Sequence, residues 1–293
     1  MVAHRTPGAG HRVPDTGCRT PGTGHRVPDT GCRTLRKSWG VRAPLFLVEP
    51  GELPVTGVFR LSGSEGRHAA KVRRVRVGER VDLGDGAGRV AECVVREVGS
   101  DDLSVEVLAC RIELEREPRF VVAQALPKGD RGELAVELMT EAGVDAIVPW
   151  AAQRSVVQWS GERGERARGR WVAHGREAAK QANRSRVPEI EALVDTPTLA
   201  KRVRAAALAI VLHESATEPL VELPIPDAGE VLIVVGPEGG VSQAELTALR
   251  NAGARVCRLG PEILRTSTAG VVALAVLSAR SCRWDLPSRT DDD

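Results

Sequence analysis

The sequence contains Gly-Pro-Glu twice near its C-terminal end, in the stretches VVGPEGGVSQAEL (234–246) and RLGPEILRTSTAG (258–270). Each copy follows a short apolar run and precedes a helix-like segment, so the pair predicts two strand-to-helix corners. Glycine lets a ligand approach the backbone closely, and proline stiffens the corner. Ile263 and Leu264 add an apolar wall. These features predict a pocket for a flat, mostly uncharged aromatic ring such as adenine, held by main-chain hydrogen bonds.

Neither corner carries one of the usual phosphate-binding patterns. They contain neither G-x-x-x-x-G-K-[ST] nor G-x-G-x-x-G with an acidic residue about twenty positions further on. Sites for nucleoside triphosphates and dinucleotides are therefore not favoured. Ser242 and Glu245 fit the S-x-x-E capping box, which we interpret as the start of a helix and not as a catalytic pair.

From Arg119 onward, short apolar runs alternate with helix-like segments. The runs are RFVVAQAL, VDAIVPW, LAIVLHES, VLIVVGPEGG and ARVCRLGPEIL, and the last helix is AGVVALAVLSA. Asp130 and Glu133 resemble a capping box and predict a helix that runs through Glu141 and ends at Gly143. This alternation predicts a parallel sheet covered on both faces, with ligands at the carboxyl ends of the strands, where both corners lie.

The preceding part, from Leu45 to about Leu114, is rich in short strands. A helix is predicted over Ser64 to Arg76, and a β-hairpin turns at Asp85-Gly86 and continues as Val90 to Val98. A further strand is predicted at Leu103 to Ile112. We expect a small β-barrel-like module.

This module also holds a dense basic stretch. Seven Lys or Arg residues and His68 lie between positions 60 and 80, against only Glu65 and Glu79. Basic runs are often solvated faces, but their density beside one helix favours nucleic-acid binding. The seven are Arg60, Arg67, Lys71, Arg73, Arg74, Arg76 and Arg80.

Residues 4–38 form consecutive seven-residue units such as HRVPDTG. Their Pro and Gly exclude a coiled coil, their His and Cys spacing gives no closed four-ligand metal set, and no apolar core marks a signal peptide. We predict a disordered low-complexity tail over 1–40 and hypothesise that the natural chain begins near Val41.

The composition, 42% apolar and 27% charged, is that of a globular protein, and no apolar run approaches the roughly 18 to 20 residues of a membrane helix. Six scattered cysteines favour free thiols and a cytoplasmic location.

GPEGGVSQAEL followed by LGPEILRTSTA resembles the paired signature of the SPOUT-class methyltransferases. More closely, the chain resembles the ribosomal RNA small subunit methyltransferase E family, which methylates N3 of uridine 1498 in 16S rRNA with S-adenosylmethionine. Further blocks in the family order are APLFLV, RHAAKVRRVRVGERVDLGDGAG, LPKGDRGELAVELMTEAGVDAIVPWAAQRSVVQW and AAKQANRSRVPEI. The chain departs from the family at Lys180 and Ser267, where Glu is more usual, and at Ala142, where a bulkier residue is usual.

The resemblance implies an α/β fold, a SPOUT-type parallel sheet with a C-terminal trefoil knot over 116–286. A PUA-like RNA-binding β-barrel over 41–115 would precede it, and a disordered acidic tail over 287–293 would follow. It implies a cytoplasmic homodimer that acts on 16S rRNA in the small ribosomal subunit and uses S-adenosylmethionine and no metal. The residues it assigns to the donor are Leu212, Gly236, Pro237, Glu238, Gly239, Leu259, Gly260, Ile263, Leu264 and Thr266.

Methyl transfer from a sulfonium is an in-line displacement, so the enzyme must hold the methyl group and the acceptor nitrogen in register. Uridine N3 must be unpaired and must lose its proton, which leaves charge on the ring that a cation near O2 or O4 would stabilise. Arg154 and Arg265 are the candidates for this cation, and His213 and Glu214 are candidate bases or base-orienting groups.

We expect the RNA to contact Arg60, Arg67, His68, Lys71, Arg73, Arg74 and Arg184. The stretch 154–186 contains nine Lys or Arg against three Glu, together with Trp159 and Trp171, and beside such a pocket this favours phosphate contact. Two alternatives stay open, a SPOUT enzyme with another RNA target and a non-catalytic RNA-binding assembly factor.

Overall fold

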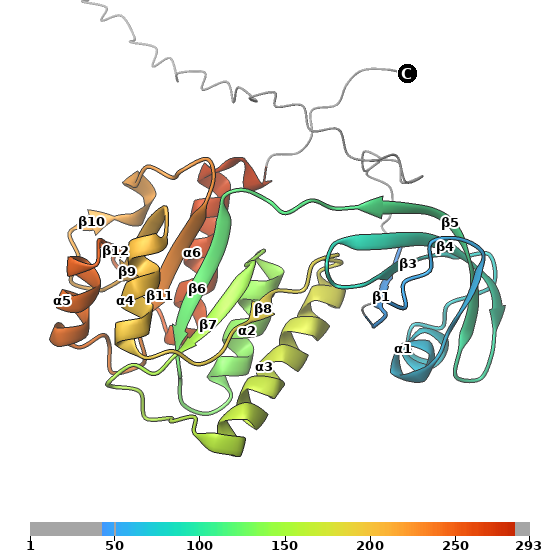
Figure 1. The fold of residues 1–293 in the computed structure, drawn as a ribbon, viewed down its shortest axis with the longest axis horizontal. Coiled ribbons are helices and arrows are strands. Elements are labelled where there is room, and N and C mark those ends of the chain that lie inside the picture. The colour runs from blue at the N-terminus through green and yellow to red at the C-terminus, as the bar shows by residue number, and fades with distance from the viewer. Residues whose placement is uncertain (1–42, 50, 285–293) are drawn as a thin grey trace, which may run out of the picture. The chain divides into compact units, whose positions relative to one another are not determined.

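The computed structural model describes residues 43–49 and 51–284, which form one smaller and one larger sheet with helices (Figure 1). The tails predicted at 1–40 and 287–293, and the proposed start near Val41, lie outside the described residues.

The smaller sheet has five strands in the order β1-β3-β4-β5-β2. Only β1 and β3 pair in parallel, and the other pairs are antiparallel. The sheet curls into a half-barrel (Figure 1). The predicted hairpin and the strand after it are confirmed. Asp85 closes the hairpin turn by accepting from the backbone N–H groups of Ala87 and Arg89. The strands are β1 (Leu45–Leu47), β2 (Val58–Leu61), β3 (Arg80–Gly84), β4 (Arg89–Val98) and β5 (Leu103–Ile112).

The helix predicted over Ser64 to Arg76 is shorter in the structure. Helix α1 (Gly63–Arg67) passes directly into a single π-helical segment, η1 (His68–Val72). The helical path ends because Arg74 adopts a left-handed backbone, with φ of 52°. The core of the module contains Phe46, Leu83 and Leu103, which are almost fully buried and belong to the same cluster as Ala69 of η1.

The larger sheet has seven strands in the order β10-β12-β9-β11-β6-β7-β8. Every neighbouring pair is parallel, which confirms the predicted parallel sheet. The strands are β6 (Arg119–Ala125), β7 (Ala146–Trp150), β8 (Glu189–Ile190), β9 (Leu208–Leu212), β10 (Glu218–Pro219), β11 (Glu230–Val235) and β12 (Arg255–Arg258). The helices are α2 (Arg131–Glu141), α3 (Gly161–Gln181), α4 (Thr196–Ala205), α5 (Gln243–Asn251) and α6 (Thr266–Arg280).

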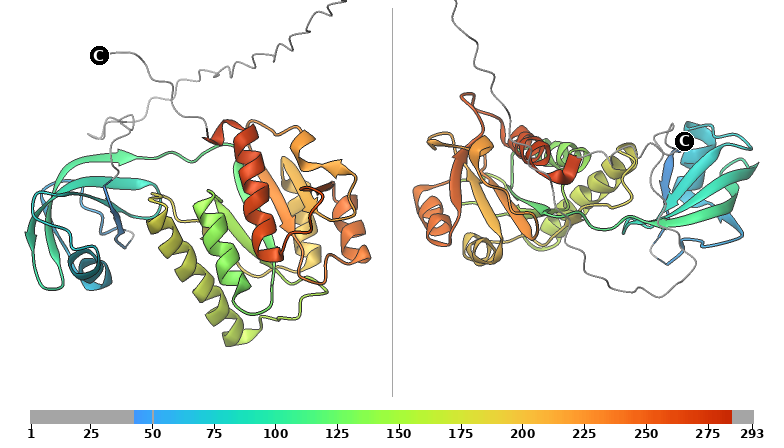
Figure 2. Two further views of the ribbon diagram at one scale, coloured as in Figure 1. Left: turned by 180° about the vertical axis from the view of Figure 1, so that it is seen from behind. Right: turned by 90° about the horizontal axis from the view of Figure 1, so that it is seen from above.

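Helices cover both faces of this sheet (Figures 1 and 2). Along β6, Val121 and Ala123 pack into a core shared with α4 and α5, whereas Phe120 and Val122 pack into a second core shared with α2, α3 and α6. Successive side chains of a strand point to opposite faces. Burial on both faces therefore explains why these strands read as continuous apolar runs.

The two predicted helix starts have different outcomes. The capping box of α5 is confirmed, since Ser242 and Glu245 exchange the expected hydrogen bonds. The capping box predicted for α2 is wrong, because Asp130 makes no side-chain cap and Glu133 pairs with Arg170 at 3.1 Å. The end of α2 agrees with the sequence, since Gly143 has φ of 97°.

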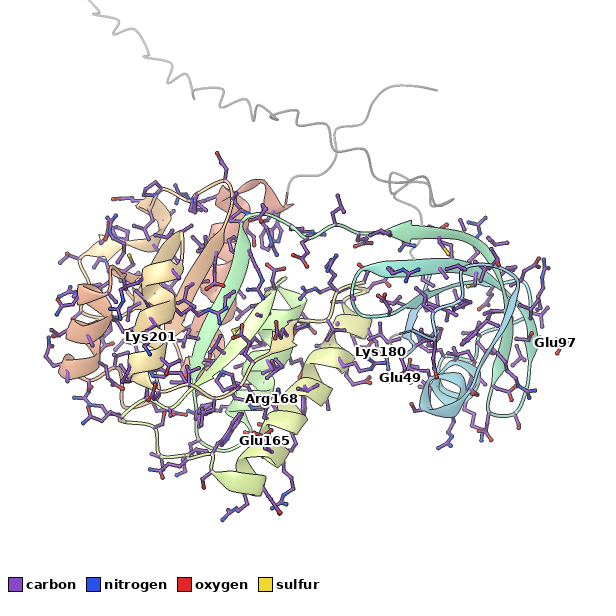
Figure 3. All side chains as sticks on the ribbon, viewed as in Figure 1. Glu49, Glu97, Glu165, Arg168, Lys180 and Lys201 are labelled. Atoms are coloured by element: carbon purple, nitrogen blue, oxygen red, sulfur yellow. The ribbon has the colours of Figure 1, made fainter. Side chains whose placement is uncertain are left out.

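Lys180, near the end of α3, links the two parts of the fold (Figure 3). Its Nζ donates to Glu65 of α1 at 2.7 Å and to Glu177 at 2.9 Å, and its side chain is only 5% exposed. Arg176, one turn earlier, donates to the Leu47 carbonyl at 3.2 Å. A buried cation with two carboxylate partners therefore joins α3 to the half-barrel.

Arg283 fastens the C-terminal end of the described chain. Its guanidinium pairs with Asp145 at 2.6 Å, donates to the carbonyls of Pro118 and Gly143, and lies 4.7 Å from the ring centroid of Phe120. This side chain is 3% exposed. The segment after α6 is thus held against the first strand of the large sheet.

Candidate functional site

Both Gly-Pro-Glu corners line one cavity of about 510 Å³ at the carboxyl ends of the parallel strands. The first corner follows β11 and the second follows β12, and the end of β9 lies between these strands in the sheet. The volume lies in the range of small-molecule sites, roughly 300–1,000 Å³. All ten residues that the resemblance assigns to the donor line this cavity.

The first corner requires its glycines. A Cβ atom on Gly236 would lie 2.9 Å from Cγ2 of Val241, and one on Gly239 would lie 3.2 Å from Cβ of Arg154. Gly240 has φ of 71°, in the left-handed region. The corner is therefore bare backbone packed tightly against its neighbours.

A buried polar network connects the two corners to β6. Gln124 lies beside Val235 in the parallel register, and its Nε2 donates to Oγ1 of Thr266 at 3.0 Å. The Thr266 hydroxyl donates to the Gly236 carbonyl at 2.7 Å. Gln124 is fully buried, and no described residue bonds its Oε1. Sequence reasoning missed this glutamine, although a lone polar residue in the apolar run RFVVAQAL was a signal.

The charged lining of the cavity has both signs. Three carboxylates and three guanidinium groups contribute: Glu214, Glu238, Glu262, Arg131, Arg258 and Arg265. Glu238 accepts from the backbone N–H of Lys128 at 3.1 Å and from Arg131 at 3.5 Å. These contacts tie the loop before α2 to the first corner. Arg131 and Arg258 were not among the sequence candidates, because the sheet order that brings them to the cavity cannot be read from local patterns.

The structure brings the four catalytic candidates to the same place. His213, Glu214 and Arg265 line the cavity, and Arg154 lies at its edge, where Nη1 donates to the Gly239 carbonyl at 2.9 Å. Nδ1 of His213 accepts from the backbone N–H of Ser215 at 3.2 Å. Neutral His213 therefore carries its proton on Nε2 and presents a donor there. Glu214, with 59% of its side chain exposed, presents acceptors only.

The basic residues of the half-barrel have carboxylate neighbours that sequence order did not reveal. Arg60 pairs with Asp102 at 2.7 Å, and Lys71 pairs with Asp101 at 2.7 Å. The hydrogen bond from Lys71 holds the pKa of Asp101 below its ordinary value. Both carboxylates lie in the turn between β4 and β5, and the fold brings this turn next to β2, which carries Arg60, and η1, which carries Lys71. Exposed pairs of this kind contribute little to stability.

The remaining RNA candidates differ among themselves. Arg67 lies 3.7 Å from Asp101, while Arg73 and Arg74 are exposed after η1. His68 packs edge-on against Phe46, with ring centroids 6.2 Å apart. Arg184 instead donates to the carbonyls of Thr140 and Val144 at 2.6 and 2.8 Å, and burial lowers its pKa to about 10. This guanidinium holds the end of α2 through these two hydrogen bonds.

Most basic side chains of the 154–186 stretch are paired within the protein. Figure 3 shows Glu165 and Arg168 projecting from α3, with 3.9 Å between their charged atoms. Arg166, Arg170, Arg176 and Arg186 likewise have carboxylate partners. Trp159 and Trp171 pack edge to face on each other, 4.9 Å between centroids. Of these pairs, those of Arg170 and Arg176 join α3 to other elements, whereas those of Arg166 and Arg168 lie within the helix.

Over residues 43–49 and 51–284, no group of three or more His, Cys, Asp or Glu side chains is arranged to hold a metal ion. No helix among the same residues is long and apolar enough to cross a membrane.

Comparisons with known proteins agree with this architecture. Residues 115–278 match the RNA methyltransferase domain family, and residues 61–108 match the RNA methyltransferase PUA domain family. The ribosomal RNA small subunit methyltransferase E of Mycobacterium bovis is 48% identical over 83% of this chain and 94% of its own length. That of Bacillus subtilis is 32% identical over 75% of this chain and 89% of its own length.

A solved methyltransferase of Legionella pneumophila, in complex with S-adenosylmethionine, is 27% identical. It covers 82% of this chain and 99% of its own, with a TM-score of 0.72. Both domain families match the chain, and the two relatives match it over most of their own length. Together these matches assign the chain to a family. The chain belongs to the ribosomal RNA small subunit methyltransferase E family.

Proposed function

We propose that this protein transfers a methyl group from S-adenosylmethionine to N3 of one uridine, position 1498, in the 16S rRNA of the small ribosomal subunit. The observation that carries the proposal is the single cavity formed by both Gly-Pro-Glu corners in a chain of this family. The reaction takes place in the cytoplasm, where ribosomal subunits are found.

The lining of the cavity suits this donor. Leu212, Leu259 and Leu264 give apolar contacts for a flat ring, and the bare backbone of the two corners gives hydrogen-bonding groups. The donor carries a sulfonium, an ammonium and a carboxylate, and the lining contains both carboxylates and guanidinium groups for them. When bound, S-adenosylmethionine supplies a methyl group activated by the positive sulfur. The Legionella relative, solved with this donor, supports the same use here.

Arg154 and Arg265 are placed to stabilise the uracil ring as N3 loses its proton. Deprotonation spreads negative charge onto O2 and O4, and a fixed cation beside either oxygen lowers the cost. A guanidinium has five N–H donors, of which the contact between Arg154 and Gly239 uses one. Arg265 comes directly before α6 and lines the cavity. We assign both side chains to charge stabilisation.

Glu214 is the better candidate for the proton acceptor. With Nδ1 of His213 accepting from the backbone N–H of Ser215, Nε2 is the donor of the neutral ring, and His213 lines the cavity. An ionised carboxylate only accepts, and Glu214 lines the same cavity. In this scheme His213 orients the uracil and Glu214 takes its N3 proton.

We also propose that the C-terminal part is threaded as a trefoil knot. β12 lies on the far side of β9 from β11, yet α6, which follows it, packs on β6, β11 and α2. The segment 259–265 must therefore return across the sheet near the first corner. A crystallographic trace of residues 208–280 that runs through without threading would exclude the knot.

We propose that the active form is a homodimer whose interface includes α6. This helix carries apolar residues on most sides, and Val272 is 36% exposed; Leu134 on neighbouring α2 is 43% exposed. Exposed apolar side chains on adjacent helices favour a protein partner. Light scattering of the purified chain, with Val272→Asp as the disrupting variant, distinguishes dimer from monomer.

The function is tested by incubating the protein with labelled S-adenosylmethionine and small subunits from a strain lacking the enzyme. We expect label in 3-methyluridine at one position, and much less on naked oligonucleotide, because the target is built from folded RNA. Label in another nucleoside would move the substrate while keeping the donor. Donor binding without any transfer would favour an assembly factor.

A further inference from the structure

Glu245 is more heavily engaged than a helix cap requires. It is 6% exposed, and both carboxylate oxygens accept two hydrogen bonds each. Oε2 accepts from the backbone N–H of Ser242 at 3.0 Å and from its hydroxyl at 2.8 Å. The capping box of α5 consists of the first of these bonds and of the bond from the backbone N–H of Glu245 to Oγ of Ser242 at 3.3 Å. The cap therefore uses only one of the two carboxylate oxygens.

The other oxygen, Oε1, reaches outside α5. It accepts from the backbone N–H of Gln153 at 2.7 Å and from the hydroxyl of Thr196 at 3.1 Å. Thr196 in turn accepts from Nε1 of Trp150 at 3.2 Å. One buried carboxylate therefore joins α5, the first turn of α4 and the turn that follows β7.

The turn after β7 carries Arg154 immediately after Gln153. Its backbone is closed by a hydrogen bond from Ser155 to the Ala152 carbonyl at 2.9 Å. Arg154 then packs against the bare backbone of Gly239 and donates to its carbonyl at 2.9 Å. The turn is thus fixed at two points, one on Glu245 and one on the first corner of the cavity.

We propose that Glu245 is a positioning residue that holds Arg154 at the edge of the donor cavity, in addition to capping α5. This inference rests on the proposed function, in which Arg154 stabilises charge on the uracil. A glutamate suits the task because an ionised carboxylate accepts at both oxygens, whereas glutamine offers one acceptor and one donor. With glutamine, the NH₂ group faces either the N–H of Gln153 or that of Ser242, so one of the two sets of bonds is lost.

Four variants separate the two tasks of Glu245. Ser242→Ala removes the hydroxyl that Oε2 accepts from and leaves the Oε1 contacts, so it is the matched control for the cap. Glu245→Ala removes both oxygens, so the result does not depend on which way a glutamine amide would turn. Arg154→Ala removes the positioned group, and the double variant E245A/R154A completes a thermodynamic cycle.

The first measurement is kcat for methyl transfer to small subunits, with KM for the donor. We expect E245A to lower kcat roughly tenfold with donor KM within about twofold, since one electrostatic contact in the transition state is misplaced. S242A should lower the melting temperature but keep kcat within about twofold. In the R154A background, E245A should lower kcat by no more than about twofold, because the group that Glu245 positions is gone.

The second measurement is hydrogen–deuterium exchange of the peptide covering 151–156, which needs no substrate. Exchange should rise in E245A and stay unchanged in S242A, since the Gln153 amide loses its acceptor only in the former. Unchanged exchange in E245A, or losses in kcat that simply add in the double variant, would overturn the positioning role. Absence of 3-methyluridine from the wild-type reaction would instead refute the proposed function.

Discussion

The side-chain amide of Gln124 and the hydroxyl of Thr266 meet at 3.0 Å inside the protein, although 142 positions separate them in the chain. The Thr266 hydroxyl donates a hydrogen bond to the Gly236 carbonyl at 2.7 Å. Strand β6, the first corner and the first turn of α6 are therefore joined by two consecutive hydrogen bonds. Gly236 and Thr266 both line the cavity, so this connection lies in its wall.

Thr266→Val tests the join while keeping the shape of the side chain. The variant removes one hydrogen bond from the buried Gln124 amide, which keeps its bond to the Ala125 carbonyl at 3.1 Å, and removes the hydroxyl that donates to the Gly236 carbonyl. We expect a cost of about 1–3 kcal/mol. We expect the dissociation constant for S-adenosylmethionine, measured by calorimetry, to rise roughly tenfold. Thr268→Val is the control, since its hydroxyl donates to the Arg265 carbonyl one turn back, at 3.1 Å, and not to the first corner. Equal donor affinity in T266V and wild type would contradict the expectation.

Arg265→Ala should slow the chemical step more than it weakens donor binding. Removing one fixed group that stabilises developing charge costs roughly 10²–10³ in rate. We expect kcat for rRNA methylation to fall by about two orders of magnitude with donor KM nearly unchanged. Arg250→Ala, on the exposed side of α5, is the control. A rise in donor KM that matches the loss in kcat/KM would place Arg265 in donor binding instead.

Arg283→Met should destabilise the large domain. The substitution removes the ion pair with Asp145 and the hydrogen bonds to the Pro118 and Gly143 carbonyls. Breaking a buried pair by removing one partner costs about 3–5 kcal/mol, most of it from the charge left behind. Urea unfolding measures the loss. The double variant R283M/D145N should recover part of it, whereas exposed Arg204→Ala should change little. No recovery would mean that lost packing on Phe120 dominates.

Cys93 and Cys257 should resist alkylation in the folded protein. Burial raises the pKa of each thiol to about 12, well above the unfolded value of about 8.5. Because the folded state favours the neutral thiol, this contribution to stability is complete below about pH 8.5 and is lost as the pH rises toward 12. Iodoacetamide at pH 9, followed by peptide mass spectrometry, should label both slowly in buffer and rapidly in concentrated urea. Equal rates in the two conditions would contradict the burial.

Much of the large sheet could be predicted because its strands are continuous apolar runs and its corners carry Gly and Pro. The residues of both corners could also be placed together, since parallel strands end at one edge of the sheet. Strand order could not be predicted: β12 lies beyond β9, and nothing local in the sequence states this. For that reason Arg131 and Arg258 were missed at the cavity.

Other differences come from partners that are distant in the chain. Glu133 resembled a cap residue, but Arg170 on α3 takes its carboxylate. Arg184 looked like an RNA ligand in a basic stretch, but it lies against the end of α2, whose carbonyls it bonds. Local patterns report capping and charge density, while tertiary packing decides which atom each polar group finally meets.

The buried Lys180 makes the two halves of this protein dependent on each other's sequence. Its cation lies between Glu177 of its own helix and Glu65 of the half-barrel. A chimera that carries a relative's barrel without an acid at position 65 would leave the buried ammonium group of Lys180 with only one of its two carboxylate partners. Substitutions at 65 and 180 are thus expected to be tolerated together and not singly, so the domains of this enzyme are not freely interchangeable modules.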